Sequence, residues 1–436
     1  MRCSLGRCGP GVLLAFLLCL AHPALAADQT ANAPPPAPTL NVNGWTLIVV
    51  PQDQTDAATR NLTIAGLNHS LRFGQLAASF TAGLQAQLRG ILDFEDQPAS
   101  GPTEIATLQS IEPVAVLDGL AVKVVSVTPG GGNGYGTALY WAQTLLANQP
   151  QGIYFISASL PTARLLIKGL TGSDVPFTGD GAYAVISGPT ADRLTAQVFH
   201  DGIAARSRFP AVPVPGPAAC SVPPTVITAK APPGLHPYPS RTVLFVRHVE
   251  AHPSTNFENG NYVCQGQWRA LGATDILARL LGRTPDAIVS SNTAGLIACN
   301  GTCSYIRPLL TVTPFAIKHG MPVTLAPFDW TDATDLAYWL FDKSSPYASD
   351  LHQADKDPSL ILVGWEHAHI VAAVKALFAQ MYQDPAAAAK LPAWSYTDYD
   401  TVWKLSTDAQ GNLTFSNTCE GIPSAALPNV CPAFFP

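Results

Sequence analysis

The sequence has little charge. Only 12% of its 436 residues are Asp, Glu, Lys or Arg, whereas 47% are hydrophobic. The 24 Lys and Arg residues form no cluster and the net charge is -6, so a positively charged groove that follows nucleic-acid phosphates is excluded. The apolar content also excludes disorder of the whole chain, and the length predicts two domains.

Long apolar runs are lacking beyond the N-terminus. An arginine-containing start is followed by the short apolar stretch 12–21 and the small-x-small pattern Ala24-Leu25-Ala26. This arrangement predicts a signal peptide over residues 1–26, because a membrane anchor needs about 20 apolar residues. We therefore expect a secreted or periplasmic protein whose mature chain has no membrane span.

Cysteine is absent between the predicted signal peptide and residue 220. The cysteines that remain after cleavage are Cys220, Cys264, Cys299, Cys303, Cys419 and Cys431. An even number in an oxidising compartment predicts disulfides. Short spacing suggests the pairs 299–303 and 419–431, which leaves 220 for 264, although six cysteines allow 15 pairings. A zinc site is the alternative, but no CxxC pair accompanies these residues.

Proline marks the boundaries along the chain. Residues 27–39 form a Pro/Ala-rich lead, and ten prolines lie within residues 209–240. Such a stretch holds neither a helix nor a central strand. We therefore predict domains at 40–208 and 241–436, joined by a linker at 209–240.

The two predicted domains repeat one another in order. Pro113 and Gly119 recur as Pro314 and Gly320, both at an offset of 201. Four blocks recur along the chain: 46–50 as 242–246, 106–122 as the stretch from 305, 138–141 as 336–339, and 182–199 as 360–378. The first domain is thus predicted to be a degenerate copy of the second.

The second domain alternates strand-like and helix-like segments. Strands are expected at 242–247, 286–290, 322–326 and 359–364, and helices at 268–281, 304–319, 332–342 and 367–383. This order predicts an α/β fold class, with two tandem three-layer α/β/α domains and mainly parallel sheets. Ligands bind such sheets beyond the carboxyl ends of the strands.

Polar residues stand at these predicted strand ends. Transfer of a phosphoryl group needs a nucleophile, cations for its oxygens and an acid for the leaving group. His248, directly after the first strand of its domain, is the candidate nucleophile. Arg247, Arg307 and His367 are the candidate phosphate-binding residues.

The acid is less clearly marked. Glu366 precedes His367, Asp329 follows the expected strand 322–326, and Glu250 is a further acidic neighbour. We take Glu366 and Asp329 as the catalytic candidates.

These residues resemble the histidine phosphatase superfamily, which includes phosphoglycerate mutases and acid phosphatases. The stretch VRHVEA at 246–251 is similar to the VRHGET signature of that family. Four later segments stand in the places of other family motifs: QGQWRALG at 265–272, DAIVSS at 286–291, RPLLT at 307–311 and VGWEH at 363–367.

The resemblance covers about residues 240 to 385. It implies a phosphohistidine on His248, a phosphate held by Arg247, Arg307 and His367, no metal or other cofactor, and hydrolysis by water. Two features depart from the family pattern. Val249 replaces the usual glycine, which we expect to narrow the pocket, and an insertion between Ser291 and Arg307 is expected to form a disulfide-pinned loop near the site mouth.

The first domain lacks the same residues. Pro51-Gln52 occupies the positions of Arg247-His248, Ala106 lies near the Arg307 position, and Ser187-Gly188-Pro189 is placed opposite Trp365-Glu366-His367. His69 and Arg72 remain in that domain, where we expect them to face solvent. The phosphate site is therefore predicted once per chain.

These observations favour a metal-independent phosphatase that acts on a small phosphorylated substrate, with no nucleic-acid partner. A mutase is disfavoured because mutases act on cytosolic metabolites. The alternative from another class is a catalytically weak or inactive protein that binds a phosphorylated ligand. The sequence reveals neither the substrate nor the oligomeric state.

Overall fold

The structure, a computed structural model, describes most of the chain after residue 36. The predicted signal peptide 1–26 and most of the lead 27–39 lie outside the described residues. No helix in the described part is long and apolar enough to cross a membrane. The described residues are 37–96, 104–128, 136–179, 181–204, 206–210, 212–251, 259–299, 301–351 and 357–434.

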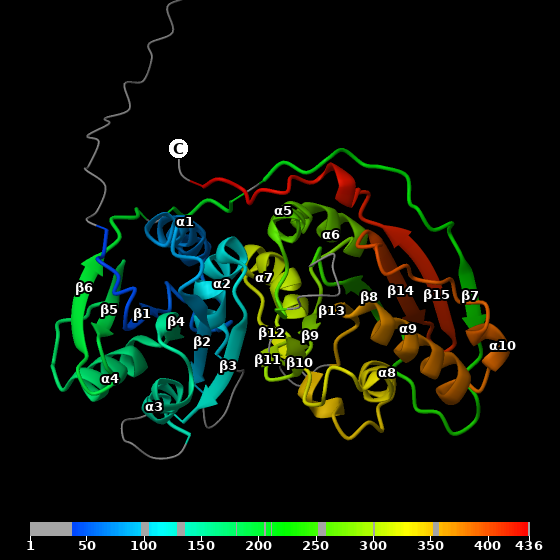
Figure 1. Cartoon of the computed structure of the whole chain (residues 1–436). Coiled ribbons are helices and arrows are strands. Elements are labelled where there is room, and N and C mark those ends of the chain that lie inside the picture. Colours follow the sequence, from blue (N-terminus) through cyan, green and yellow to red (C-terminus); the bar gives the residue numbers. More distant parts are fainter. Residues whose placement is uncertain are drawn as a thin grey trace, which may run out of the picture. The chain divides into compact units, whose positions relative to one another are not determined.

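The first half of the described chain forms a six-stranded sheet in the order β3-β2-β4-β1-β5-β6 (Figure 1). The first four of these strands run parallel, and β5 and β6 are antiparallel to their neighbours. The strands are β1 (Trp45–Pro51), β2 (Leu88–Asp96), β3 (Val122–Val127), β4 (Gly152–Ala158), β5 (Ala182–Gly188) and β6 (Thr195–His200).

Helices cover both faces of this sheet. Alternate residues of β1 point to opposite sides, because successive side chains of a strand do so. Leu47 and Val49 pack with helices α3 and α4, whereas Ile48 and Val50 pack with α1 and α2. The helices are α1 (Ile64–Phe80), α2 (Ala106–Asp118), α3 (Ala138–Asn148) and α4 (Leu160–Thr171).

The second half forms a seven-stranded sheet in the order β12-β9-β13-β8-β14-β15-β7. Its first four strands are parallel and the last three are antiparallel. These strands are β7 (Val226–Ala229), β8 (Thr242–Arg247), β9 (Ala287–Ser290), β12 (Val323–Leu325), β13 (Leu360–Trp365), β14 (Thr401–Thr407) and β15 (Leu413–Cys419).

Helices again lie on both faces. Leu244 and Val246 of β8 pack with α5, α6 and α7, whereas Val243 and Phe245 pack with α8 and α9. A π-helix (Leu377–Met381) extends α9, and the short helix α10 (Pro385–Ala388) follows. The longer helices are α5 (Cys264–Gly272), α6 (Thr274–Leu281), α7 (Arg307–His319), α8 (Ala333–Phe341) and α9 (His367–Ala376).

The first six strands of the second sheet follow the same order as the six strands of the first sheet, so the predicted α/β repeat is confirmed. Strands β1 and β8 correspond, as do α2 and α7, and α3 and α8. Pro113 and Pro314 lie inside matching helices, and Gly119 and Gly320 end them in the left-handed conformation that glycine favours.

The fourth predicted block is wrong. Residues 182–188 form the antiparallel strand β5, whereas Leu360–Trp365 is the parallel strand β13. The partner of β13 in the first half is β4, because both lie beside the first strand of their sheet. Residues 158–160 therefore stand opposite 365–367, in place of the predicted Ser187-Gly188-Pro189.

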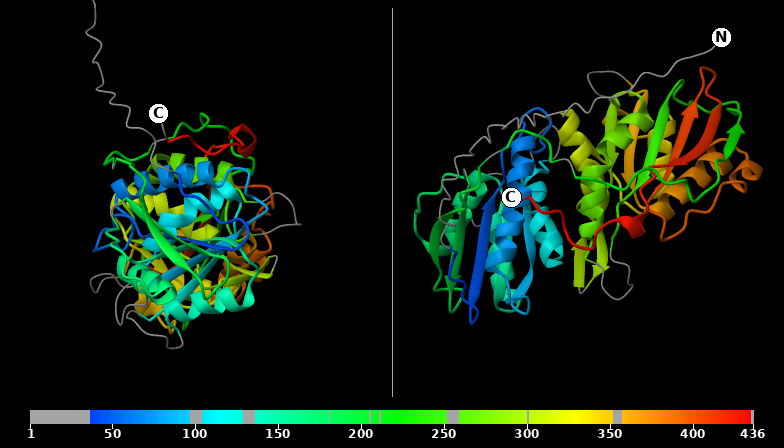
Figure 2. Two further views of the ribbon diagram at one scale, coloured as in Figure 1. Left: turned by 60° about the vertical axis from the view of Figure 1, so that its left-hand side comes forward. Right: turned by 90° about the horizontal axis from the view of Figure 1, so that it is seen from above.

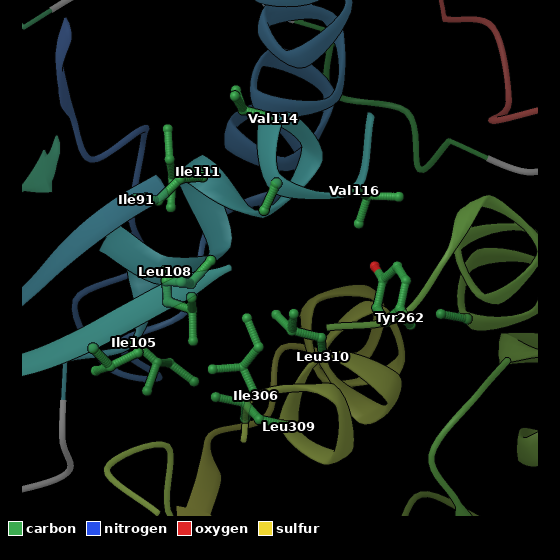
Figure 3. Close-up of a cluster of buried hydrophobic side chains, with 14 of the residues drawn as sticks. Ile91, Ile105, Leu108, Ile111, Val114, Val116, Tyr262, Ile306, Leu309 and Leu310 are labelled. Carbon is green, nitrogen blue, oxygen red and sulfur yellow. The ribbon is translucent and has the colours of Figure 1, made fainter. Parts of the chain in front are cut away.

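One apolar cluster joins the two halves. It contains Leu108 and Ile111 of α2 together with Leu309 and Leu310 of α7, which face one another in Figure 3. Hydrogen bonds also cross between the halves, among them those from Asn61 Nδ2 to the Met321 carbonyl at 2.7 Å and from Val124 N to Ser304 Oγ at 2.9 Å. The domain boundaries at 208 and 241 stay a prediction, and β7 lies within the predicted linker as an edge strand.

The six described cysteines form three disulfides, so the alternative of a zinc site on them is wrong. The expected pair Cys299–Cys303 is confirmed. The other two expected pairs are wrong, because the structure joins Cys220 to Cys419 and Cys264 to Cys431. The prediction paired cysteines that are close in sequence, whereas both of these disulfides join cysteines that are distant in sequence, 199 and 167 residues apart.

Candidate active site

Four polar residues stand where three elements of the second half begin or end. Strand β8 ends at Arg247, and the next backbone N–H, of His248, donates to the Trp365 carbonyl at the end of β13, at 2.9 Å. Helix α7 begins at Arg307 and helix α9 at His367. All four side chains are buried or nearly so.

His248 is held in one tautomer. Its Nδ1 lies 2.9 Å from the Val249 carbonyl. A carbonyl oxygen only accepts, so Nδ1 donates and the lone pair of the neutral ring is on Nε2. Burial, followed by the charges of Arg307 and Arg247, holds the pKa of His248 well below its ordinary value. The ring is therefore neutral near pH 7 and suited to nucleophilic attack.

Two buried guanidinium groups lie beside this imidazole. Arg247 and Arg307 are 3% and 4% exposed. Burial lowers the pKa of Arg307 to about 10 and lowers that of Arg247 as well, yet both remain charged at neutral pH. Arg247 Nη1 is positioned by backbone carbonyls at residues 395, 396 and 398, the shortest hydrogen bond being 2.5 Å to Tyr396.

Three tyrosines surround these groups, and the sequence analysis missed them. Burial raises the pKa of Tyr305 well above its ordinary value, so its hydroxyl stays protonated. Each tyrosine ring lies beside predicted site residues. The ring centre of Tyr399 is 4.0 Å from the Arg247 guanidinium and 5.9 Å from that of the His248 ring. The ring centre of Tyr305 is 5.1 Å from the Arg307 guanidinium, and that of Tyr396 is 5.8 Å from that of the His367 ring. No sequence signal marks them, because Tyr396 and Tyr399 come from a loop after the recognised motifs.

Glu366 is engaged by two histidines. One carboxylate oxygen contacts His367 Nδ1, and the other lies 2.7 Å from His369 Nδ1 and also accepts the His369 backbone N–H at the start of α9. Burial disfavours the charge of Glu366, but these hydrogen bonds outweigh it and hold its pKa below the ordinary value. The carboxylate is therefore ionised near neutral pH.

The other two acidic candidates are also engaged. Asp329 is exposed and accepts from Thr331 N at 2.9 Å and from Thr331 Oγ1 at 2.6 Å. Glu250 is buried and receives three hydrogen bonds from Arg269, the shortest being 2.7 Å. Within the described residues, no group of three or more His, Cys, Asp or Glu side chains is placed to hold a metal ion.

Val249 packs in the core of the second half. It is 2% exposed and belongs to the core cluster, and its Cγ2 lies 2.8 Å from the place that a β-carbon on Gly266 would take. Its backbone N–H donates to Thr311 Oγ1 at 3.0 Å. The absence of a side chain at Gly266 makes room for Val249, and the expectation that Val249 narrows the pocket stays a prediction.

The insertion before α7 forms a hairpin of β10 (Leu296–Cys299) and β11 (Gly301–Ser304), with its disulfide across the strands. The hairpin packs along β3 of the first half. Tyr305, the next residue, packs on Trp330 with ring centres 4.4 Å apart and faces His248. The insertion thus contributes one wall of the site through Tyr305.

The matching edge of the first half lacks every phosphate-binding side chain. The Gln52 N–H donates to the Ala158 carbonyl at 2.9 Å, as His248 does to Trp365. By this correspondence, Pro51 and Gln52 take the places of Arg247 and His248. Ala106 begins α2 where Arg307 begins α7, and Leu160 begins α4 where His367 begins α9.

A polar pocket of about 740 Å³ lies at that edge and is lined by Gln52, Leu160 and His69. His69 Nδ1 lies 2.5 Å from Asp53, and its Nε2 lies 3.0 Å from Asp201. Burial lowers the pKa of His69, but the hydrogen bonds that its ring donates to the two carboxylates outweigh burial and raise the pKa to about 10. The expectation that His69 and Arg72 face solvent is wrong, because His69 is mostly buried and Arg72 is 8% exposed.

No protein-family model matches the chain, and no curated protein matches it. Solved structures of the histidine phosphatase superfamily match one part of the chain. The protein histidine phosphatase SixA complexed with tungstate is 20% identical over 36% of this chain and 96% of its own, with a TM-score of 0.27. A mycobacterial glucosyl-3-phosphoglycerate phosphatase is 14% identical over 42% and 99%, with a TM-score of 0.26. The case for a reaction rests on the residues described above.

Proposed function

We propose that this protein is a metal-independent phosphatase that hydrolyses phosphomonoesters through a phosphohistidine on His248. The observation that carries the proposal is a neutral imidazole whose Nδ1 is tied to a carbonyl and whose Nε2 carries the lone pair, beside two buried guanidinium groups. A nucleophile and cations for phosphate oxygens are the two parts that phosphoryl transfer needs most.

The electrostatics of the pocket favour an anionic ligand. Burying a charge is costly unless it is paired. The hydrogen bonds of Arg247 to described residues go to backbone carbonyls, which carry no net charge, and its Nε makes none. A phosphate dianion beside Arg247 and Arg307 offsets this cost, since a guanidinium fork matches two phosphate oxygens.

The proposed reaction has two steps. In the first, His248 Nε2 forms a bond to phosphorus while the bond between phosphorus and the ester oxygen breaks, and the leaving oxygen takes a proton from an acidic group. In the second, water attacks phosphorus and returns a proton to that group, the bond between phosphorus and Nε2 breaks, and inorganic phosphate leaves. Arg247 and Arg307 stabilise the charge on the phosphoryl oxygens in both steps.

We assign Glu366 a positioning role in this scheme. An ionised carboxylate has no proton to give, and Glu366 contacts both His367 and His369. Its contact with Nδ1 of His367 favours a proton on that nitrogen and orients the ring as a phosphate-binding group. We therefore propose Glu366 for positioning and keep Asp329 as the candidate proton donor.

We further propose that the protein is secreted or periplasmic. The three disulfides support this, because structural disulfides persist in oxidising compartments.

The second candidate function is a protein that binds a phosphorylated ligand without turning it over. The observation that favours it is that Glu250 is bound by Arg269 and Glu366 by two histidines, which ties up both carboxylates next to the site residues.

The test is hydrolysis of p-nitrophenyl phosphate with a chelator present. We expect turnover by the wild type and a loss of roughly 10³-fold or more in kcat/KM for His248→Ala, as for removal of a nucleophile. Gln52→Ala, at the matching position of the first half, is the control and should keep the wild-type rate. Brief reaction with ³²P-labelled substrate, followed by an alkaline quench, should leave an acid-labile label that His248→Ala lacks.

Equal rates for the wild type and His248→Ala would contradict the enzyme proposal. Saturable binding of inorganic phosphate by the wild type, weakened in Arg307→Gln but without any turnover, would establish the binding protein instead.

A further inference from the structure

A second concentration of positive charge lies away from His248. A cavity of about 540 Å³ is lined by three arginines, Arg72, Arg206 and Arg208, and by three aromatic residues, Phe209, Trp268 and Phe434. No Asp or Glu lines it among the described residues. In a chain with a net charge of -6 and only 24 basic residues, three arginines without an acid are a marked local excess.

Four separate segments build this cavity. Arg72 lies on α1, Trp268 lies on α5, the stretch after β6 carries Arg206, Arg208 and Phe209, and Phe434 belongs to the C-terminal segment. Figures 1 and 2 show the red C-terminal segment passing over α5 and ending beside α1. The cavity is therefore a product of the tertiary structure and has no counterpart as a sequence motif.

Specific hydrogen bonds hold these segments in place. Asn68 Nδ2 donates to the Arg206 carbonyl at 2.9 Å and to the Arg208 carbonyl at 2.7 Å, which fixes the arginine-bearing stretch against α1. Gln75 Nε2 donates to the Pro432 carbonyl at 2.7 Å, and Gln75 Oε1 accepts from the Phe434 N–H at 3.1 Å. The disulfide between Cys264 and Cys431 fastens the same C-terminal segment to α5.

Like charges lie close together in this cavity. Burial lowers the pKa of Arg72, and the nearby charge of Arg206 lowers it further. Asp201 acts in the opposite direction, but its carboxylate is bound to His69 at 3.0 Å and to the Ile203 N–H at 2.8 Å. An anion in the cavity relieves the repulsion between the two guanidinium groups.

We propose that this cavity binds a small organic anion with a sulfonate, phosphate or carboxylate group beside an aromatic or other flat apolar group. The guanidinium groups suit the oxygens of the anionic group, and the aromatic walls suit the flat part. The volume falls within the range of about 300–1,000 Å³ that is usual for small-molecule sites, and is larger than a bare inorganic ion requires. The site is separate from the proposed phosphatase site.

Isothermal titration with naphthalene-2-sulfonate tests the proposal. We expect saturable one-to-one binding by the wild type, weakened at least tenfold in the double variant Arg206→Gln with Arg208→Gln. Both side chains are exposed, so the fold should survive, which thermal melting checks. The control is Arg193→Gln with Arg279→Gln, which removes the same charge at exposed positions outside the cavity and should bind within twofold of the wild type.

Two further measurements need no cavity variant. The neutral analogue naphthalene-2-methanol should bind at least tenfold more weakly than the sulfonate, and higher salt should weaken only the sulfonate. Arg307→Gln should leave sulfonate binding unchanged.

Equal binding by the double variant and the wild type would overturn the proposal, as would no saturable binding at all. Equal affinity for the neutral analogue would reduce the cavity to an apolar patch, and loss of binding in Arg307→Gln would place the probe in the phosphatase site. Either result overturns the proposal.

Discussion

Strands β1 and β8 occupy the same place in two sheets whose first six strands follow the same order, yet they end in different chemistry. After β8 come Arg247 and His248, which Arg307 and His367 join from two helix starts. After β1 come Pro51 and Gln52, and the matching helix starts carry Ala106 and Leu160. The backbone hydrogen bond that follows each strand is nevertheless the same, at 2.9 Å in both halves.

This comparison separates the residues that build the fold from those that act in it. Both strands bury apolar side chains on their two faces, and both halves keep the helix-ending glycines Gly119 and Gly320. Packing therefore persists where the phosphate-binding residues do not. The fold alone does not predict a reaction, which depends on a few side chains placed on it.

The histidines of the two edges show the same contrast. His248 lies between guanidinium groups and is neutral, whereas His69 lies between Asp53 and Asp201 and is protonated. The surroundings of His248 suit an anion, whereas the surroundings of His69 already contain two carboxylates beside the protonated ring.

The largest effect on stability is expected from a change at Arg269. This residue is 1% exposed and binds Glu250 at 2.7 Å and Glu420 at 2.8 Å. Arg269→Ala should lower the free energy of unfolding by roughly 3–5 kcal/mol, because it leaves buried carboxylates without their cation. Urea denaturation measures this, with exposed Arg279→Ala as the control. A change below 1 kcal/mol would show that the cluster contributes little to stability.

Arg307→Gln should have the next largest effect, on catalysis. Loss of a charge that stabilises phosphoryl oxygens is expected to lower kcat/KM by about 10²–10³-fold. Steady-state hydrolysis of p-nitrophenyl phosphate measures it, with Gln52→Ala as the matched change at the other edge. If both variants lose activity equally, the two edges are not functionally distinct.

His69 should give the first half a pH-dependent stability. Its folded pKa of about 10 exceeds the ordinary value of 6.5, so its contribution is fully present below pH 6.5 and is lost as the pH rises toward 10. The slope is about 1.4 kcal/mol per pH unit for one proton. The unfolding free energy, measured from pH 7 to 9, should therefore fall less steeply in His69→Gln. Parallel curves for the two proteins would rule this out.

Val249→Ala should have the smallest effect on activity. Its side chain packs in the core beside Gly266, so kcat/KM should change less than threefold. The unfolding free energy should fall by roughly 1–2 kcal/mol from lost burial. A tenfold rise in kcat/KM would instead show that Val249 restricts the pocket.

Much of the second half was predictable from its sequence. The expected strands at 242–247, 286–290, 322–326 and 359–364 correspond to β8, β9, β12 and β13, and the expected helices to α5 through α9. Buried parallel strands read as continuous apolar runs, and amphipathic helices follow them. Antiparallel strands β14, β15 and β7 were missed, since they follow the recognised motifs or lie in the proline-rich stretch.

The site was predicted only in part. Arg247, His248, Arg307 and His367 were found because each adjoins a strand or helix boundary that the sequence marks. The sequence did not predict the three tyrosines of the site or the protonated His69 between Asp53 and Asp201, since these contacts join residues far apart in the chain. The fourth repeat block failed for a related reason: β5 and β13 have similar compositions, and only pairing direction distinguishes them.

The sequence by itself determined the α/β repeat, the single set of residues that we propose for phosphate binding, and the even number of cysteines. Apolar periodicity and local spacing carry that information. Only the tertiary structure decided which cysteines pair, which tautomer His248 adopts, that Glu366 is ionised between two histidines, and that three arginines share one cavity. Those properties depend on burial and on distances between segments far apart in the chain, which local patterns do not contain.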